Sequence, residues 1–273
     1  MISFIKRATI FALIIVSMPV LAAKTDLLML LPGFPGTTAQ AQPYVDKMLR
    51  YLEKDLKLKS GTMKGLFISD ASKAQKKLEA VKPGIALMGA SVYAQNSKTS
   101  NITVIAKLYA NGQKEQKYYI VTGKKGAGNL ADLKGKAISG QLANDGRFIQ
   151  NVIFDKKGPA NLTFKFQKRA LKSLRDVAKG KVDAAIIDDV TKEHMKTLDF
   201  AKELKIIFTS KPVPVPVVVV LNSAKKDAAK IKKSLTTICN TKEGKALCKS
   251  LTISSIIPAA NSDYKALLKK YNR

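Results

Sequence analysis

The sequence predicts an α/β protein of two lobes, each a mostly parallel β-sheet flanked by helices. Short apolar runs alternate with helical patterns along the chain, as is typical of β-α-β units. Residues Val81–Gly89 and Lys179–Asp188 share one form: a helix end, a turn, a buried strand and a polar tip. The chain is long enough for one large domain or two of roughly 100–150 residues. The repetition of this form in the two halves favours two domains.

The N-terminus has the three parts of a secretory signal peptide. Lys6 and Arg7 precede the apolar run Ala8–Val20, and small residues end at Ala23. We expect cleavage after Ala23, which makes residues 1–23 the signal peptide. The alternative is a membrane anchor, but the run is shorter than the roughly 20 residues that span a bilayer. Since no cysteine lies near the cleavage site, we expect a periplasmic protein that is not a lipoprotein.

The first half of the mature chain alternates strands with helices. The run Leu27–Leu31 is wholly apolar, which indicates a strand covered on both faces. Between Tyr44 and Leu56, apolar residues recur every three or four positions, which predicts a helix. Further strands are expected at 63–68, 84–88, 102–108 and 117–122, with a lysine-rich helix at 71–81.

The second half repeats this order. Asn129–Lys136 is expected to form a single helical turn between capping signals. Pro212, Pro214 and Pro216 indicate an edge or crossing segment, because proline cannot donate to a β-ladder. Strands are expected at 137–140, 162–166, 182–188, 204–208 and 217–221, and helices at 145–154, 171–179, 224–238 and 263–271.

Two crossings between the lobes are expected, near Ala110–Thr122 and near Pro212–Val219. This divides the mature chain into lobe 1, residues 24–115 plus 217–273, and lobe 2, residues 116–216.

The charge is strongly basic. Without Lys6 and Arg7, 46 basic residues stand against 20 acidic ones, a net charge of +26 that attracts anions and acidic polymers. Nucleic-acid recognition favours arginine forks and aromatic stacking, whereas this chain has few arginines and no tryptophan. The lysines are scattered over predicted helices such as 70–82 and 225–233. We therefore expect a solvated lysine-rich surface, no nucleic-acid partner and a monomer, with a polyanion-binding surface as the alternative.

The residues that could carry chemistry are few. Cys239 and Cys248 are the only cysteines, and an oxidising compartment favours a disulfide between them. His194 is the only histidine, so a zinc site is not expected. The stretch Gly123–Gly128 lacks the spacing of a phosphate-binding loop, and no nucleophile motif accompanies Asp188 and His194. We expect a protein that is not an enzyme and has no cofactor.

Three segments resemble known binding proteins. Leu130–Lys136 and Ala178–Ala185 resemble segments of the second lobe of type-2 periplasmic solute-binding proteins. Gly84–Tyr93 is similar to a segment of their phosphate/phosphonate-binding branch, the phosphonate/sulfonate/transferrin-like substrate-binding family of ABC transporters. The resemblance implies a two-lobed Venus-flytrap fold with a ligand between the lobes. It also implies a periplasmic component of an ABC-type importer, with a permease in the inner membrane as partner.

The ligand is expected at the carboxyl ends of strands, as in other open α/β sheets. Ser91 and Thr38 can bind ligand through their hydroxyls or cap helices. Tyr93 can wall the cleft or pack in the core, and Asp188 can meet a cationic group or cap the next helix. The candidate ligand-binding residues are Phe34, Thr37, Thr38, Ser91, Tyr93, Asn144, Asp145, Arg147 and Asp188.

The resemblance favours a phosphonate- or phosphate-like anion as ligand. Phosphonate binders usually carry a Ser/Thr-rich stretch where this chain has Gln141–Arg147. Asp145 repels a phosphonate unless it faces away, Arg147 can compensate, and Phe34 makes the first strand end apolar. Two alternatives therefore stay open: a larger, partly apolar or lipid-like ligand, and a polyanion bound at the basic surface.

Overall fold

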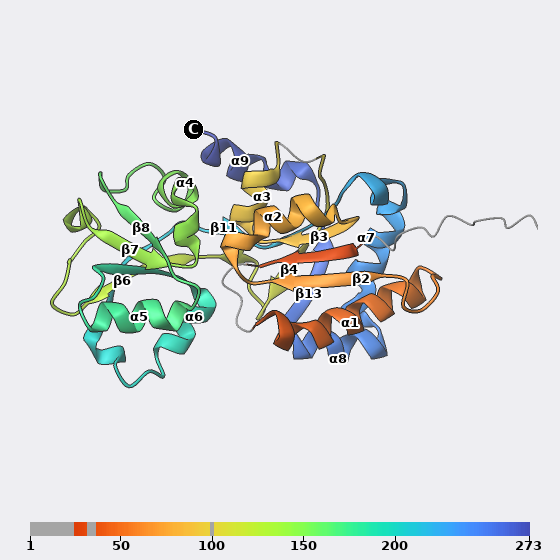
Figure 1. Ribbon diagram of the computed structural model, residues 1–273, viewed down its shortest axis with the longest axis horizontal. Helices are drawn as coiled ribbons and strands as arrows, with labels where there is room; N and C mark the ends of the chain where they lie inside the picture. Colours follow the sequence, from red (N-terminus) through yellow and green to blue (C-terminus); the bar gives the residue numbers. More distant parts are fainter. Residues whose placement is uncertain (1–24, 32–36, 99–100) are drawn as a thin grey trace, which may run out of the picture.

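The computed structural model describes residues 25–31, 37–98 and 101–273 as two α/β lobes side by side (Figure 1). The signal peptide expected at residues 1–23 and the candidate residue Phe34 lie outside the described residues. No helix of the described ranges is long and apolar enough to cross a membrane.

The first lobe contains a six-stranded sheet in the order β13-β4-β12-β3-β1-β2. Its strands are β1 (Thr25–Leu30), β2 (Lys64–Ile68), β3 (Ile85–Met88), β4 (Thr103–Ala110), β12 (Val217–Val220) and β13 (Ile253–Pro258). One face packs on α1 (Thr38–Asp55), α7 (Ala228–Thr237) and α8 (Lys242–Ser250). The other face packs on α2 (Ala71–Val81), α3 (Ala90–Asn96) and α9 (Lys265–Tyr271).

The second lobe contains a five-stranded sheet in the order β10-β6-β9-β7-β8. Its strands are β6 (Tyr118–Gly123), β7 (Ala137–Gly140), β8 (Thr163–Phe166), β9 (Ala184–Asp188) and β10 (Leu204–Thr209). One face packs on α5 (Ala170–Ala178), with α6 (Asp189–Met195) beside it (Figure 1). The other packs on α4 (Gly146–Phe148) and the π-helical turn η3 (Ile149–Ile153), where one longer helix was predicted.

Both sheets are mixed rather than mostly parallel. The β-α-β units give the expected parallel pairs, β1 with β2 and β3, and β7 with β8 and β9. Strands that follow a crossing run the other way: β12 is antiparallel to β3 and β4, and β6 is antiparallel to β9 and β10. The prediction of α/β lobes is confirmed, and its emphasis on parallel pairing was too strong.

The two crossings pair with each other. β5 (Glu115–Gln116) and β11 (Val213–Pro214) form a two-stranded antiparallel ribbon between the sheets. Pro214 is tolerated because such a ribbon has a free edge on each strand. The chain therefore changes sheets at both places where the sequence predicts a crossing.

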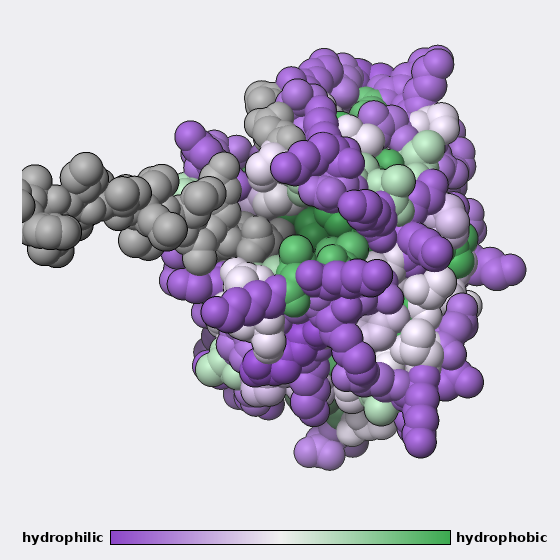
Figure 2. All heavy atoms as spheres, turned by 90° about the vertical axis from the view of Figure 1, so that its right-hand side faces the viewer, coloured by the Kyte–Doolittle hydropathy of each residue, from purple (hydrophilic) through white to green (hydrophobic). Residues whose placement is uncertain are grey.

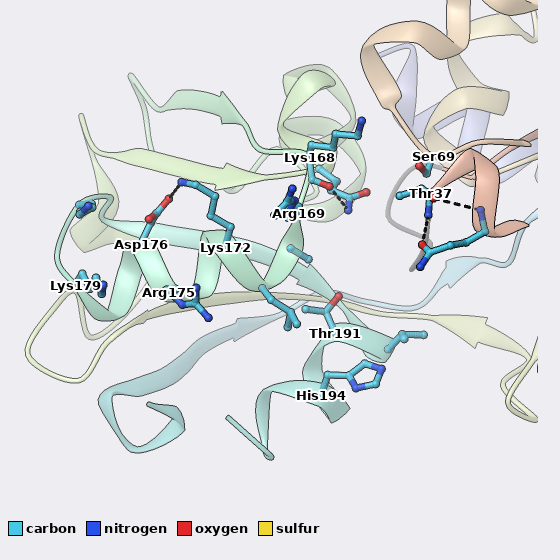
Figure 3. Close-up of a pocket in the computed structure, with 16 residues that line it drawn as sticks. Thr37, Ser69, Lys168, Arg169, Lys172, Arg175, Asp176, Lys179, Thr191 and His194 are labelled. Carbon is cyan, nitrogen blue, oxygen red and sulfur yellow. Dashed lines mark hydrogen bonds and ion pairs between the residues drawn. The ribbon is translucent and has the colours of Figure 1, made fainter. Parts of the chain in front are cut away.

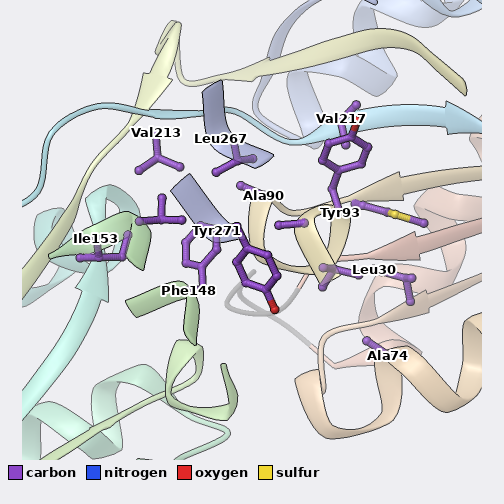
Figure 4. Close-up of a cluster of buried hydrophobic side chains, with 14 of the residues drawn as sticks. Leu30, Ala74, Ala90, Tyr93, Phe148, Ile153, Val213, Val217, Leu267 and Tyr271 are labelled. Atoms are coloured by element: carbon purple, nitrogen blue, oxygen red, sulfur yellow. The ribbon is translucent and has the colours of Figure 1, made fainter. Parts of the chain in front are cut away.

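The C-terminal helix α9 lies at the seam between the lobes (Figure 1). It packs on α3 of the first lobe and on η3 of the second. The buried cluster around it joins Tyr93 and Leu267 to Phe148 and Ile153, so one apolar core runs across the seam (Figure 4).

Cys239 and Cys248 form the predicted disulfide, with their Cα atoms 5.6 Å apart. The bond ties the turn η6 (Ile238–Asn240) to α8.

The end of the first lobe that lies farthest from the second has a mostly hydrophilic surface, and hydrophobic residues gather in a small area near its centre (Figure 2). On α2, Lys73, Lys76 and Lys77 are all exposed, as a solvated lysine-rich helix requires.

Candidate binding cleft

A cavity of about 970 Å³ opens between the two lobes (Figure 3). The first lobe contributes Thr37, Gln40 and Ser69 to its wall. The second lobe contributes the larger share, from α5, from the residues on either side of α5, and from α6. Figure 3 shows Thr37 and Ser69 on one side of the cavity, facing Lys168 and Arg169 on the other.

The cavity lies where the parallel strands of both sheets end. Thr37 and Ser69 follow β1 and β2, while Gln141, Lys168 and Thr191 follow β7, β8 and β9. In α/β proteins the crevice outside the carboxyl ends of the strands is the usual ligand site. The topology thus brings two sets of strand ends to one place.

The wall supplied by the second lobe is cationic. Six cationic side chains line the cavity: Lys168, Arg169, Lys172, Arg175, Lys179 and Lys181. Among the described residues that line it, Asp176 is the one with an acidic side chain. Lys172 donates to Asp176 at 2.5 Å, and this hydrogen bond holds the pKa of Asp176 below its ordinary value. Arg169 forms no ion pair within the described ranges, so its guanidinium is available to an anion.

Polar groups accompany these charges. Gln141 Nε2 donates to the backbone oxygen of Lys168 at 2.7 Å, whereas its buried Oε1 accepts no hydrogen bond from any described residue. Thr37 caps α1: its Oγ1 accepts from Gln40 N at 3.2 Å, and Gln40 Oε1 accepts from Thr37 N at 2.9 Å. A bound solute could therefore meet cations, an amide oxygen and a hydroxyl in one cavity.

Two of the predicted site residues lie at or next to this cavity. Thr37 lines it, and Thr38 follows as the first residue of α1. Asp188 caps α6 through Thr191 N at 2.8 Å and lines two smaller cavities, of about 70 and 40 Å³, beside the ribbon. Burial raises the pKa of Asp188 above its ordinary value.

The other predicted residues lie at the seam, away from the cavity. Ser91 Oγ donates to Asp145 Oδ2 at 2.7 Å. Tyr93 is 3% exposed and packs edge-on against Tyr264, so its ring lies in the core. Arg147 lies over the ring of Tyr271, 5.1 Å from its centroid. Asn144 is exposed in the turn Leu142–Asn144.

Ser69, Lys168 and Arg169 were not among the predicted site residues. Their position in the sequence could have identified them, because each follows a parallel strand, β2 or β8, in the same way that Thr37 follows β1. The predicted site residues follow β1, β3, β7 and β9, so the ends of β2 and β8 contribute none of them. No three His, Cys, Asp or Glu side chains come together as a metal site would require within the described part of the chain.

Solved structures of low sequence identity share this fold. A binding protein of a Pseudomonas aeruginosa ABC phosphonate transporter aligns with TM-score 0.68 and 14% identity, over 90% of this chain and 86% of that one. A Prochlorococcus marinus protein in complex with methylphosphonate aligns with TM-score 0.68 and 14% identity, over 92% and 98%. A Xanthomonas citri protein bound to ATP aligns with TM-score 0.70 and 12% identity, over 90% and 95%.

No curated protein matches the sequence. A family model described as "ABC transporter, phosphonate, periplasmic substrate-binding protein" matches residues 36–264, which is most of the chain. The chain belongs to the family of periplasmic substrate-binding proteins of phosphonate ABC transporters.

Proposed function

We propose that this protein captures an anionic solute with phosphonate- or phosphate-like groups in the basic cavity and delivers it to an ABC permease. The observation that carries the proposal is the cavity itself. It opens at the strand ends of both lobes, and six cations from one lobe line it. Of these, Lys168 and Arg169 lie opposite Thr37 and Ser69 of the other lobe, and Lys168 also pairs with Asp70 at 3.8 Å. No covalent step is required, so the role is that of a carrier and not of an enzyme.

The mechanism is capture by closure. We assign residues 24–115 plus 217–273 to lobe 1 and residues 116–216 to lobe 2, joined by the β5–β11 ribbon. An anion held by Arg169 and Lys168 on one lobe can also accept from the Thr37 and Ser69 hydroxyls on the other. Contacts made with both lobes at once favour the closed form, because ligands shift a hinge equilibrium by differential binding.

The related structures support phosphorus oxyanions as the ligand class. The P. marinus protein holds methylphosphonate and the X. citri protein holds ATP. A cavity of about 970 Å³ is large enough for either kind of ligand, and its row of cations along α5 suits a ligand with several anionic groups.

The test is calorimetric titration with methylphosphonate, inorganic phosphate and ATP, with small-angle scattering to follow closure. We expect saturable binding and a smaller radius of gyration with at least one of these anions. Arg169→Gln should weaken that binding about 10- to 100-fold, as for loss of a charge-assisted hydrogen bond. Lys233→Gln, at an exposed position of α7, removes the same charge far from the cavity and should change affinity less than about twofold.

The net charge of +26 supports a second candidate, binding of acidic polymers by the whole basic surface. In that case Arg169→Gln and Lys233→Gln would weaken binding equally, and added salt would abolish it. Heat and compaction absent with all three small anions, together with salt-sensitive polymer binding, would overturn capture in the cavity.

A further inference from the structure

Asp145 is a buried carboxylate that bridges the two lobes. It is 5% exposed, and its Oδ2 accepts from Ser91 Oγ and from Gln95 Nε2, each at 2.7 Å. Its Oδ1 accepts from Phe148 N at 3.0 Å. Ser91 and Gln95 belong to α3 of the first lobe, whereas Asp145 and Phe148 belong to the second.

The hydrogen-bond donors around Asp145 are arranged as in a binding site for an oxyanion. Burying a carboxylate is unfavourable unless hydrogen bonds replace its lost water, and here three donors from two lobes do so. The same donors would suit a free carboxylate, phosphate or phosphonate. Because the chain's own carboxylate fills this position, a free anion would have to displace it or bind against its charge.

The surroundings hold Asp145 in place. Phe148 packs against Tyr271 with ring centroids 6.3 Å apart, and Figure 4 shows both rings at the seam. Burial, and next the negative charge of Asp145, raise the pKa of Tyr271 above its ordinary value. The guanidinium of Arg147 lies over the Tyr271 ring, so this cation, which could have compensated a second anion, is used in packing.

We propose that Asp145 is a specificity-determining residue, a built-in anion that joins the two lobes and excludes small oxyanions from the position between Ser91 and Gln95. A solute is then left with the basic cavity as its site. This inference rests on the proposed function for the nature of the ligand, but the exclusion by Asp145 can be tested without it.

The experiment is chemical rescue of Asp145→Ser. The serine hydroxyl can still cap Phe148 N, while the carboxylate that Ser91 and Gln95 bind is gone. Acetate, methylphosphonate and inorganic phosphate are each titrated at constant ionic strength, and the Tm is recorded. We expect a saturable rise of about 5–10 °C at about 100 times the Kd of the rescuing anion, larger than the rise of the wild type.

Two controls separate rescue from general anion effects. Asp145→Asn fills the same volume, so added anions should stabilise it no more than the wild type. Asp132→Ser removes an exposed carboxylate that also accepts two backbone N–H groups, from Gly128 and Asn129, and it should show no rescue. Asp145→Ser responding to anions no more than these controls would overturn the inference.

Gln95→Ala gives an independent decision if Asp145→Ser does not fold. Gln95 donates to Asp145 and does not line the basic cavity, so anion affinity should stay within about twofold of the wild type. A tenfold loss of methylphosphonate affinity would place the ligand at this position and overturn the inference, while capture of an anion would stand. Rescue of Asp145→Ser by acetate, with no anion bound by the wild type, would instead support Asp145 and overturn the proposed function.

Discussion

At the scale of single residues, Glu53 shows what a buried carboxylate does when no ligand is involved. It is 2% exposed on α1, and its two oxygens accept from Gly61 N at 2.9 Å and Met63 N at 2.7 Å. It therefore ties the loop after α1 to the helix, much as Asp145 ties one lobe to the other.

Replacing Glu53 by alanine should destabilise the protein by about 1–3 kcal/mol, because the buried N–H of Met63 loses its acceptor. The neighbouring variant Lys54→Ala is the control. Its ion pair with Glu243 at 2.7 Å is exposed on both sides, so its loss should cost less than about 1 kcal/mol. Urea unfolding measures both, and equal losses would contradict the role given to Glu53.

Single residues also show why the cleft was only partly predictable. Thr37 was predicted because a polar residue after an apolar strand is visible in the sequence. The direction of a side chain is not visible there: Tyr93 and Arg147 follow strand ends too, yet they pack against Tyr264 and Tyr271. Those partners come from the last turns of the chain, which no local pattern links to the strand ends.

At the scale of helices and strands, local sequence patterns predict nearly all elements, but they do not predict the direction in which the strands pair. Lengths and apolar periods predict β1 and β9 closely, and they predict where α1 ends, but α1 begins at Thr38, six residues before the predicted start at Tyr44. The antiparallel direction of β6 and β12 depends on how the chain re-enters each sheet after a crossing. That is decided by contacts between distant segments, which the sequence of a single strand does not contain.

The disulfide between η6 and α8 should stabilise the first lobe modestly. It closes a loop with a sequence separation of 9 residues, and for a loop this short the chain-entropy model gives about 2–3 kcal/mol. Substituting both Cys239 and Cys248 by serine should lower the free energy of unfolding by that amount in oxidising buffer. With a reductant present, the two proteins should unfold at similar denaturant concentrations, and a persistent difference would point to packing instead.

Asp155 anchors the C-terminal helix to the second lobe. Lys211 and Arg273 lie 3.3 Å from its carboxylate and Lys270 lies 3.6 Å away. The hydrogen bond from Lys211, followed by the charge of Lys270, holds the pKa of Asp155 below its ordinary 3.8. A carboxylate with a depressed folded-state pKa stabilises the fold above its ordinary value and stops doing so as the pH falls through the lowered one.

The Tm difference between the wild type and Asp155→Asn should therefore be constant from neutral pH down to about 4 and vanish below that. Thermal melts between pH 7 and pH 2.5 measure it. Asp227→Asn serves as the control, since Asp227 forms no ion pair among the described residues. A difference that grew on acidification would contradict the anchoring role.

At the scale of the whole molecule, charge is the dominant property. The full sequence carries a net charge of +28, and these like charges repel one another in the folded state. Raising sodium chloride from about 20 to about 300 mM shortens the Debye length, so the Tm should rise. Sucrose, which acts without screening charge, gives the comparison, and a Tm that fell with salt would show that ion pairs outweigh the repulsion.

The disulfide has a practical consequence for watching this protein work. Its two cysteines are the only ones in the chain and both are bonded, and the chain contains no tryptophan. A cysteine introduced at Leu171, which is 43% exposed in the wall of the basic cavity, would be the sole reactive thiol. A fluorophore attached to this thiol would label a single defined position on α5, and its emission would report solute entry without interference from tryptophan.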